Sequence, residues 1–277
     1  MTNLYDANYV ARYFDELGER EWTRLVDSPA DEIKLYIHSH YLEKHIEQGS
    51  LVLDVGAGPG RFTQLLVSLG ATVVVADISA QQIDLNKRFA AELNFAHGVK
   101  EWRQLDICDM SAFPNEMFDA VVCYGNPLGY VFEKRNEAFT EALRVLRRGG
   151  RAFFSVASLW GSLHELLPAV LTIDPAKNAE IVRTGDVYFD DSDGLRHRSH
   201  LFRAGEFQEF LERRREISIL DLSTSNCVSA VWGEKLKDIR ADSARWSELL
   251  GMELEACRQP GCLDIGTNLL AVIAKNT

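Results

Sequence analysis

The sequence lacks paired cysteines, long apolar runs and a signal peptide. Its five cysteines form no CxxC pair, and no histidine stands at a zinc-like spacing from them, so we expect reduced thiols and no set of metal ligands. No window approaches the roughly 18 apolar residues that a membrane-spanning helix requires. The first residues are polar and acidic, without the apolar core of a signal peptide. These absences predict a cytoplasmic protein with no membrane partner.

The sequence also lacks a dense basic surface and the short motifs of several enzyme classes. Its formal net charge is −11, whereas nucleic-acid binding depends on clustered Lys and Arg. The one tight basic cluster, residues 213–215, lies between Glu212 and Glu216, and we interpret it as a solvated helix end. GxSxG, HExxH and P-loop motifs are absent, which leaves hydrolase, zinc-protease and kinase functions without support. No nucleic-acid partner is expected, although acidity alone does not exclude a tRNA substrate.

The most informative segment that is present is a glycine loop after an apolar run, LVLDVGAGPG, at residues 51–60. Glycine weakens regular elements, so three glycines at every second position indicate a sharp turn that lets the backbone approach a ligand. An apolar strand, an acidic residue, a glycine loop and a helix, in that order, predict a nucleotide-type pocket at the carboxyl end of a parallel strand. The spacing is GxGxG, which disfavours a nicotinamide-dinucleotide site, because that fingerprint is GxGxxG.

From residue 51 to 157, strand-like and helix-like periods alternate. The expected strands are 51–55, 72–76, about 99–105, 119–124 and 152–156, and strands at 217–222 and 269–274 follow later. A helix closed by Gly70 separates the first two strands, and a helix that extends to Leu146 is closed by the glycine pair 149–150. Ser79 and Gln82 predict a capping box for a helix that follows the second strand. Because Ser79 serves as the cap, Asp77 is free to contact a ligand. Alternating strands and helices predict an α/β fold with a doubly wound, parallel sheet.

Five segments in this order resemble the successive motifs of class I S-adenosylmethionine-dependent methyltransferases: VLDVGAGPG, VVVADIS, QLDICDM, FDAVVCYG and LRVLRRGG. The resemblance covers most of the chain. It implies a Rossmann-like, seven-stranded sheet, mostly parallel, in which the last strand is reversed, and residues 269–274 are similar to that strand. Arg148 departs from the family, which commonly has proline before the paired glycines. The implied cofactor is S-adenosyl-L-methionine, with S-adenosyl-L-homocysteine as its product.

The resemblance also divides the chain. Residues 1–48 are expected to form a helical lid that is rich in aromatic side chains, and residues 49–277 the methyltransferase domain. Within that domain we expect an insertion at about 158–203, with a turn-rich stretch at 190–194, to shape the acceptor pocket. The sequence does not indicate an oligomeric state.

The expected cofactor contacts follow from the strand ends. Backbone N–H groups at the N-terminus of the helix suit the carboxylate of the donor, which the glycines allow to come close, and Asp54 suits its ammonium group, directly or through water. Asp77 is placed to accept the ribose hydroxyls, and Asp106 with Ile107 to hold the adenine. The predicted cofactor-binding residues are Asp54, Gly56, Ala57, Gly58, Gly60, Asp77, Ile78, Asp106, Ile107, Tyr124 and Gly125.

The acceptor is less defined. Residues 126–130, NPLGY, are similar to the NPPY-type motif of amino-group methyltransferases but differ in sequence and position, so we favour transfer to an O or N atom of a small molecule. Methylation of RNA or protein through Asn126 and Pro127 stays an alternative, as does a protein that binds S-adenosylmethionine without methylating. A hydroxyl acceptor benefits from a general base. The candidate catalytic residues are His164, His200 and Tyr130, with His197 as a further histidine of the insertion.

Overall fold

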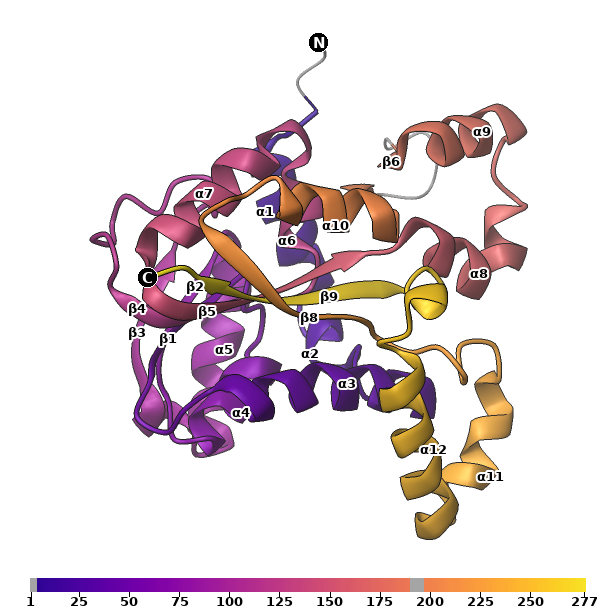
Figure 1. Cartoon of the computed structure of the whole chain (residues 1–277), viewed down its shortest axis with the longest axis horizontal. Helices are drawn as coiled ribbons and strands as arrows, with labels where there is room; N and C mark the ends of the chain where they lie inside the picture. The colour runs from indigo at the N-terminus through magenta and orange to yellow at the C-terminus, as the bar shows by residue number, and fades with distance from the viewer. Residues whose placement is uncertain (1–3, 190–196) are drawn as a thin grey trace.

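The structure is a computed structural model that describes residues 4–189 and 197–277. A seven-stranded sheet in the order β3-β2-β1-β4-β5-β9-β8 runs through it (Figure 1). Strand β9 is antiparallel to both of its neighbours, and the pairs among the first five strands are parallel. The predicted α/β fold, with a mostly parallel sheet and a reversed last strand, is confirmed. The strands are β1 (Leu51–Val55), β2 (Thr72–Asp77), β3 (Val99–Gln104), β4 (Phe118–Cys123), β5 (Leu146–Ala157), β8 (Ile217–Thr224) and β9 (Asn268–Lys275).

Strand side chains alternate between two apolar cores, one on each face of the sheet. Val73 and Val75 of β2 contribute to the core beneath α3 (Pro29–His45), α4 (Arg61–Ser68), α5 (Ala80–Glu92) and α12 (Ser243–Ala256). Val74 of the same strand contributes to the opposite core, with α7 (Arg135–Val145) and α10 (Ala204–Glu212). Figure 1 shows these two groups of helices on opposite sides of the sheet. Because both faces are covered, the central strands are continuous apolar runs.

Strand β5 begins six residues earlier than the sequence predicts. Leu146 was expected in the helix before β5, but α7 ends at Val145 and β5 starts at Leu146. Leu146 pairs with Phe118 of β4, and the register then shifts before Ala120 pairs with Arg151. The glycine pair 149–150 therefore lies in an irregular part of the strand and does not close the helix.

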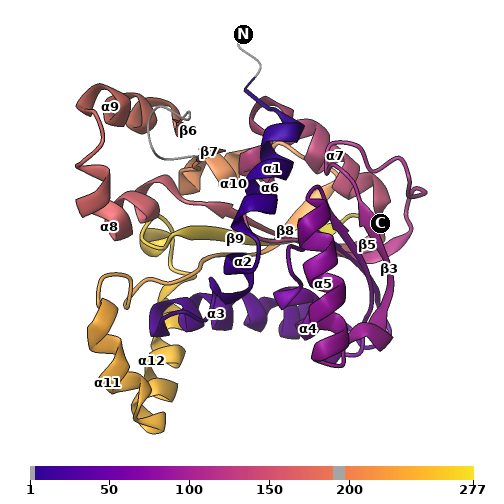
Figure 2. The ribbon, with the colours of Figure 1, turned by 180° about the vertical axis from the view of Figure 1, so that it is seen from behind.

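The N-terminal helices are α1 (Ala7–Leu17), α2 (Arg20–Thr23) and α3. In the view of Figure 2 they lie in front of the sheet. The segment 158–203 contains α8 (Leu159–Val170), α9 (Pro175–Thr184) and the antiparallel pair β6 (Asp186–Tyr188) and β7 (Arg198–His200). The expected turn-rich stretch at 190–194 lies outside the described residues. The remaining short helices are α6 (Pro127–Tyr130) and α11 (Leu236–Arg240). The division at residue 48 and the acceptor-shaping insertion stay predictions.

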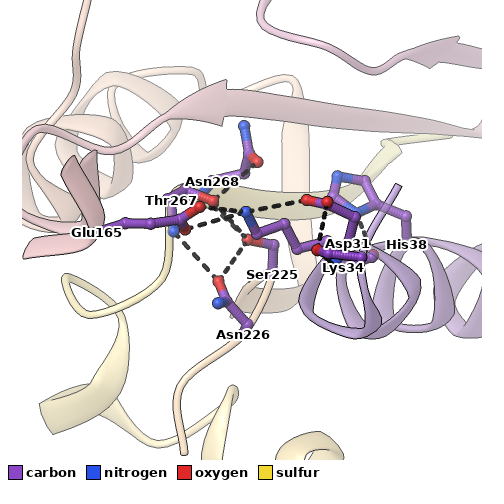
Figure 3. Close-up of polar contacts among 9 residues, drawn as sticks. Asp31, Lys34, His38, Glu165, Ser225, Asn226, Thr267 and Asn268 are labelled. Carbon is purple, nitrogen blue, oxygen red and sulfur yellow. Dashed lines mark hydrogen bonds and ion pairs between the residues drawn. The ribbon is translucent and has the colours of Figure 1, made fainter. Parts of the chain in front are cut away.

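An ion pair joins the N-terminal helices to the inserted segment. Lys34 Nζ of α3 lies 2.9 Å from Glu165 Oε1 of α8 and 3.5 Å from Asp31 Oδ1. The two carboxylates compensate the charge of a lysine that is only 7% exposed. Figure 3 shows Lys34 and Glu165 pointing toward each other. The same view contains hydrogen bonds among Ser225, Asn226, Thr267 and Asn268.

Helices in the described part of the chain are either too short or too polar to cross a bilayer.

Candidate active site

A pocket lies at the carboxyl ends of β1, β2 and β4, where the sequence analysis placed the cofactor. Its lining from the sheet side comprises Val55, Gly56, Ala57, Gly58, Pro59, Arg61, Phe62, Asp77, Ile78, Leu105, Asp106, Ile107, Tyr124, Gly125, Pro127, Tyr130 and Val131. The other wall comes from the N-terminal segment and comprises Tyr5, Val10, Phe14, Glu21, Arg24 and Leu25. Segments far apart in the sequence thus enclose one cavity. No described residue of 158–203 is part of this lining.

The glycine loop is shaped by positions that cannot accept a side chain. Gly56 has φ +70°, and a Cβ there would lie 2.7 Å from Cγ of Pro127. Gly60 has φ +100°, and its Cβ would lie 2.7 Å from Nδ2 of Asn86. Both the backbone conformation and the space therefore require glycine. Gly60 is the N-cap residue of α4 and does not line the pocket, whereas Gly56, Ala57 and Gly58 do.

The backbone N–H groups of this loop are engaged within the protein. Those of Gly56 and Ala57 donate to the carbonyl of Ala76, at 2.9 and 3.2 Å. The Gly60 N–H donates to the Ala57 carbonyl at 3.2 Å, and the Gly58 N–H donates to Asp77 at 2.8 Å. These four N–H groups therefore already have acceptors within the protein. The expected contact between N–H groups at the N-terminus of the following helix and a ligand carboxylate stays a prediction.

Asp77 shapes the loop as well as the pocket. Its Oδ2 accepts from the Gly58 N–H and its Oδ1 from the Ser79 N–H at 2.9 Å. Burial raises the pKa of Asp77 to about 6, against the opposing effect of these hydrogen bonds. The sequence analysis assigned the cap of the next helix to Ser79 and left Asp77 for a ligand, and it did not foresee these two hydrogen bonds. Each carboxylate oxygen has a second lone pair, so the side chain that lines the pocket can still accept from a ligand hydroxyl.

The predicted capping box is only half formed. Ser79 Oγ accepts from the Gln82 N–H at 3.0 Å and caps α5. The Gln82 side chain instead donates to the carbonyls of Phe14, at 2.8 Å, and Gly18, at 3.1 Å. The Gln82 side chain does not complete the capping box because the Ser79 N–H already donates to Asp77. It reaches the carbonyls of the N-terminal segment because α1 packs against this end of α5. Gln82 therefore ties the N-terminal segment to the rim of the pocket.

Asp54 lies beneath the loop rather than in the pocket lining. Its side chain is 2% exposed, and Oδ2 accepts from the Thr63 hydroxyl at 2.7 Å. Burial raises the pKa of Asp54 to about 7, against the opposing effect of the Thr63 bond. Its expected contact with an ammonium group stays a prediction, and it would require a route past Val55 and Gly56, which line the pocket.

Asp106 carries a contact that the sequence analysis missed. Its Oδ1 accepts from the Cys108 N–H at 2.8 Å, and its Oδ2 accepts from the Tyr5 hydroxyl at 2.5 Å. Burial and the neighbouring Asp106 carboxylate raise the pKa of the Tyr5 phenol, which therefore stays protonated and donates. Tyr5 thus holds the N-terminal segment over the predicted adenine site. The aromatic enrichment of that segment was the only signal for this contact in the sequence.

Three further charged side chains in the lining, those of Glu21, Arg24 and Arg61, were not predicted. Glu21 Oε1 of α2 lies 2.7 Å from Arg24 Nη2, in an ion pair at the pocket wall. Nearby, Arg61 donates to the Trp22 carbonyl at 2.6 Å, and its guanidinium lies 3.8 Å from the centroid of the Trp22 ring. The Arg61 contacts cross from the N-terminal segment to α4 and have no periodic signature in the sequence, whereas Glu21 and Arg24 are three residues apart within the N-terminal segment.

Among the predicted catalytic residues, Tyr130 lines the pocket and the two histidines do not. His164 is exposed on α8. His200 is 4% exposed, and its ring nitrogens lie 2.7 Å from Asp186 and 2.8 Å from Glu206. Burial lowers the pKa of His200, but the two carboxylates more than offset this and raise it. These contacts join β6 and β7 to α10, which is a structural arrangement.

His197 lies nearest to the pocket wall of the three histidines. Its ring packs against Tyr130 with 5.9 Å between centroids, and Nδ1 lies 3.2 Å from the Tyr13 hydroxyl. Burial lowers the pKa of His197. Phe14 packs against the same Tyr130 at 5.1 Å, so this end of the pocket is bounded by aromatic rings.

Residues 53–154 match a family described as "Methyltransferase domain". This match covers the glycine loop and the strand ends that carry Asp77 and Asp106. Over these residues the chain is similar to methyltransferase domains. Within the part that the structure describes, no group of three or more His, Cys, Asp or Glu side chains is arranged to hold a metal ion.

Known proteins similar to this chain include a probable methyltransferase of Aspergillus luteorubrus, 32% identical over 52% of this chain and 49% of that protein. The mitochondrial ubiquinone biosynthesis O-methyltransferase of Schizosaccharomyces pombe is 26% identical over 74% of this chain and 70% of that protein. A solved structure described as a DhpI–SAH complex has the same fold, with a TM-score of 0.60, 18% identity and coverage of 99% and 98%. The chain thus spans about half the length of the Aspergillus relative.

Proposed function

We propose that the protein transfers a methyl group from S-adenosylmethionine to an oxygen or nitrogen atom of a small-molecule acceptor. The observation that carries this proposal is one pocket into which the glycine loop, Asp77 and Asp106 all open from successive strand ends. The relative whose name specifies an O-methyltransferase of ubiquinone biosynthesis supports a small-molecule acceptor.

The residues present suit this donor. The Asp77 carboxylate lies beside Ile78 in the lining and would accept the ribose hydroxyls, and Asp106 would accept from the adenine amino group. Ile78 and Ile107 would offer apolar surface to the ring, and Tyr124 and Gly125, which follow β4, would lie beside the thioether. When bound, S-adenosylmethionine supplies an electrophilic methyl group to the lone pair of the acceptor.

The protein would act mainly by positioning and by excluding water. Phe14, Leu25 and Tyr130 bound the pocket with apolar and aromatic surface, which keeps water from the reacting atoms. Much of the acceleration of methyl transfer can come from alignment of the acceptor atom, the methyl carbon and the sulfur. Tyr130 is the predicted catalytic residue that this geometry favours, because it lines the pocket. His164 and His200 are not assigned a role in this proposal.

The alternative of an RNA or protein acceptor depends on Asn126, whose amide would grip a planar amine. Asn126 is 5% exposed, and its Oδ1 accepts from the Ala157 N–H at 2.9 Å. The amide oxygen is therefore occupied by the backbone of β5, whereas Pro127 does line the pocket. This contact disfavours the macromolecular alternative.

The test is release of S-adenosylhomocysteine, followed by mass spectrometry, when the purified protein is incubated with S-adenosylmethionine and a panel of hydroxylated and amino compounds. We expect acceptor-dependent release and a mass increase of one methyl group on the acceptor. Tight binding of S-adenosylmethionine without turnover on any acceptor would instead favour a protein that binds the donor and does not methylate.

A further inference from the structure

His200 lies between two carboxylates that come from two different elements. Its Nδ1 is 2.7 Å from Asp186 Oδ1 of β6, and its Nε2 is 2.8 Å from Glu206 Oε1 of α10. An ionised carboxylate can only accept a hydrogen bond, so a ring nitrogen at this distance must carry a hydrogen. Both ring nitrogens carry one only in the imidazolium form. The geometry therefore describes a charged His200, although the residue is buried.

A third element adds a second positive charge to this junction, which we define as His200, Asp186, Glu206 and Arg135. Arg135 Nη1 of α7 is 3.3 Å from Glu206 Oε1, and Glu206 Oε2 accepts from the Arg203 N–H at 3.4 Å. The charged side chains that act on the His200 ring are thus two carboxylates, from β6 and α10, and one guanidinium, from α7. Two positive and two negative charges balance in the junction when His200 is protonated.

Loss of this proton would place a lone pair against a carboxylate. Glu206 keeps two other donors, the Arg135 guanidinium and the Arg203 N–H. Within the described residues, the Asp186 side chain has no hydrogen bond other than the one to His200. The hydrogen of a neutral ring is therefore best placed on Nδ1, and the lone pair of Nε2 then faces the Glu206 oxygen at 2.8 Å. This repulsion lies between β7 and α10, so deprotonation weakens the attachment of the β6–β7 pair to α10.

The β6–β7 pair also contacts the wall of the pocket. His197 directly precedes β7, and its Nδ1 is 3.2 Å from the hydroxyl of Tyr13 on α1. Its ring packs against Tyr130, which lines the pocket, with 5.9 Å between centroids. In β7 itself, the Arg198 guanidinium lies 4.0 Å from the centroid of the Tyr9 ring on α1. Movement of β7 relative to α10 would therefore loosen the contacts behind Tyr130.

We propose that His200 is a pH-sensitive switch, whose imidazolium attaches the β6–β7 pair to α10 and whose deprotonation releases the pair from α10 and from Tyr130. Burial lowers the pKa of His200, and the two carboxylates more than offset this and raise it above 6.5. The attachment is therefore complete below about pH 6.5 and is lost as the pH rises through the raised pKa. Burial lowers the pKa of His197, which stays neutral over this range. The consequence for an acceptor beside Tyr130 rests on the proposed function, whereas the switch is tested without donor or acceptor.

The experiment combines two measurements on the full chain. An NMR titration of the histidine rings gives the pKa of His200. Hydrogen–deuterium exchange at about pH 6 and about pH 8, corrected for the intrinsic exchange rate, gives the opening of the β6–β7 pair. The amides that report it include those of Phe189 and Leu201, which donate to the carbonyls of His197 and Gly185 at 3.1 and 2.7 Å. We expect opening to increase about tenfold for each unit by which the measured pKa exceeds 6.5, whereas amides of β1 and β4 should not change.

Two variants show whether His200 is the group responsible. The side chain in His200→Gln is neutral at every pH and can donate to only one of the two carboxylates. Its β6–β7 amides should exchange at about pH 6 as fast as those of the parent at about pH 8, without further change between the two. His164→Gln is the matched control, because His164 is an exposed histidine of α8 in the same segment, 158–203. It should keep the pH dependence of the parent, and thermal unfolding should show that both variants are folded.

Three results would overturn the inference. A His200 ring that titrates at or below pH 6.5 would show that the carboxylates do not hold its proton. Equal exchange in the parent before and after His200 titrates would show that the β6–β7 pair stays attached without the proton. A His200→Gln variant that keeps the pH dependence of the parent would assign the switch to another group. Each of these leaves the proposed function standing, and a protein that transfers no methyl group would leave the switch standing.

Discussion

Replacement of Asp77 by asparagine tests how the pocket holds the donor. In the parent, the Asp77 carboxylate accepts from the N–H groups of both Gly58 and Ser79. The substitution keeps the size of the side chain, removes its charge and leaves one oxygen, which can accept from only one of these two groups. Hydrogen bonds to a charged acceptor contribute about 1.5–3 kcal/mol each. We therefore expect Asp77→Asn to weaken binding of S-adenosylhomocysteine by about 2 kcal/mol, or roughly 30-fold.

The same substitution has a second, pH-dependent effect. Burial raises the pKa of Asp77 from 3.8 to about 6, so the folded protein binds this proton more tightly than the unfolded chain. The Asp77 contribution to stability is thus most favourable at low pH and declines as the pH rises from about 4 to about 6. With about 1.4 kcal/mol per pKa unit, the decline is about 3 kcal/mol. Asp77→Asn removes this dependence, which urea unfolding followed by tryptophan fluorescence would measure.

The binding assay is calorimetry at pH 7.5 on the parent and the variant, with Asp84→Asn as control, because Asp84 is exposed and paired with Lys87 at 3.0 Å. The control should match the parent. A folded Asp77→Asn protein that binds S-adenosylhomocysteine within twofold of the parent would refute the ribose assignment.

Two further predictions concern the N-terminal helices. His38 Nδ1 donates to the Lys34 carbonyl at 2.7 Å, and burial lowers its pKa to about 4, so the folded protein should lose about 3 kcal/mol of stability as the pH falls from about 6.5 to about 4. His38→Gln should abolish this part of the pH dependence of urea unfolding, and an unchanged pH profile would contradict the assignment. Deletion of residues 1–20 removes Tyr5, Val10 and Phe14 from the pocket wall and should weaken binding of S-adenosylhomocysteine about tenfold or more. Calorimetry that finds equal affinity would show that this wall does not contact the ligand.

The sheet was predictable because its central strands are buried on both faces. Such strands appear as unbroken apolar runs, so β1 and β2 could be located from the sequence. The start of β5 could not, because Leu146 continues the apolar period of the preceding helix and joins the strand only through its pairing with Phe118. The spacing of apolar residues along the sequence cannot show whether a residue at a boundary belongs to the helix or to the strand.

In the pocket, the sequence could show which side chains lie at the strand ends, but not which residues they contact. Asp77 and Asp106 could be located because carboxyl ends of neighbouring parallel strands share one edge of the sheet. Tyr5 reaches Asp106 across 101 residues of sequence, and that contact depends on where an amphipathic helix docks. His200 was assigned to catalysis from its residue type, whereas its carboxylate partners become apparent only when β6 and β7 pair.

The position of β9 constrains the order in which the protein can be assembled during synthesis. β8 is hydrogen-bonded in the described sheet only to β9, which in turn pairs with β5. A nascent chain that has emerged through residue 224 therefore holds the first five strands of the sheet and an unattached β8. The sixth position of the sheet fills only after residues 268–275 leave the ribosome, and β8 can then add at the edge. Until that moment β5 presents an open, apolar sheet edge, which is the form of this chain most exposed to aggregation.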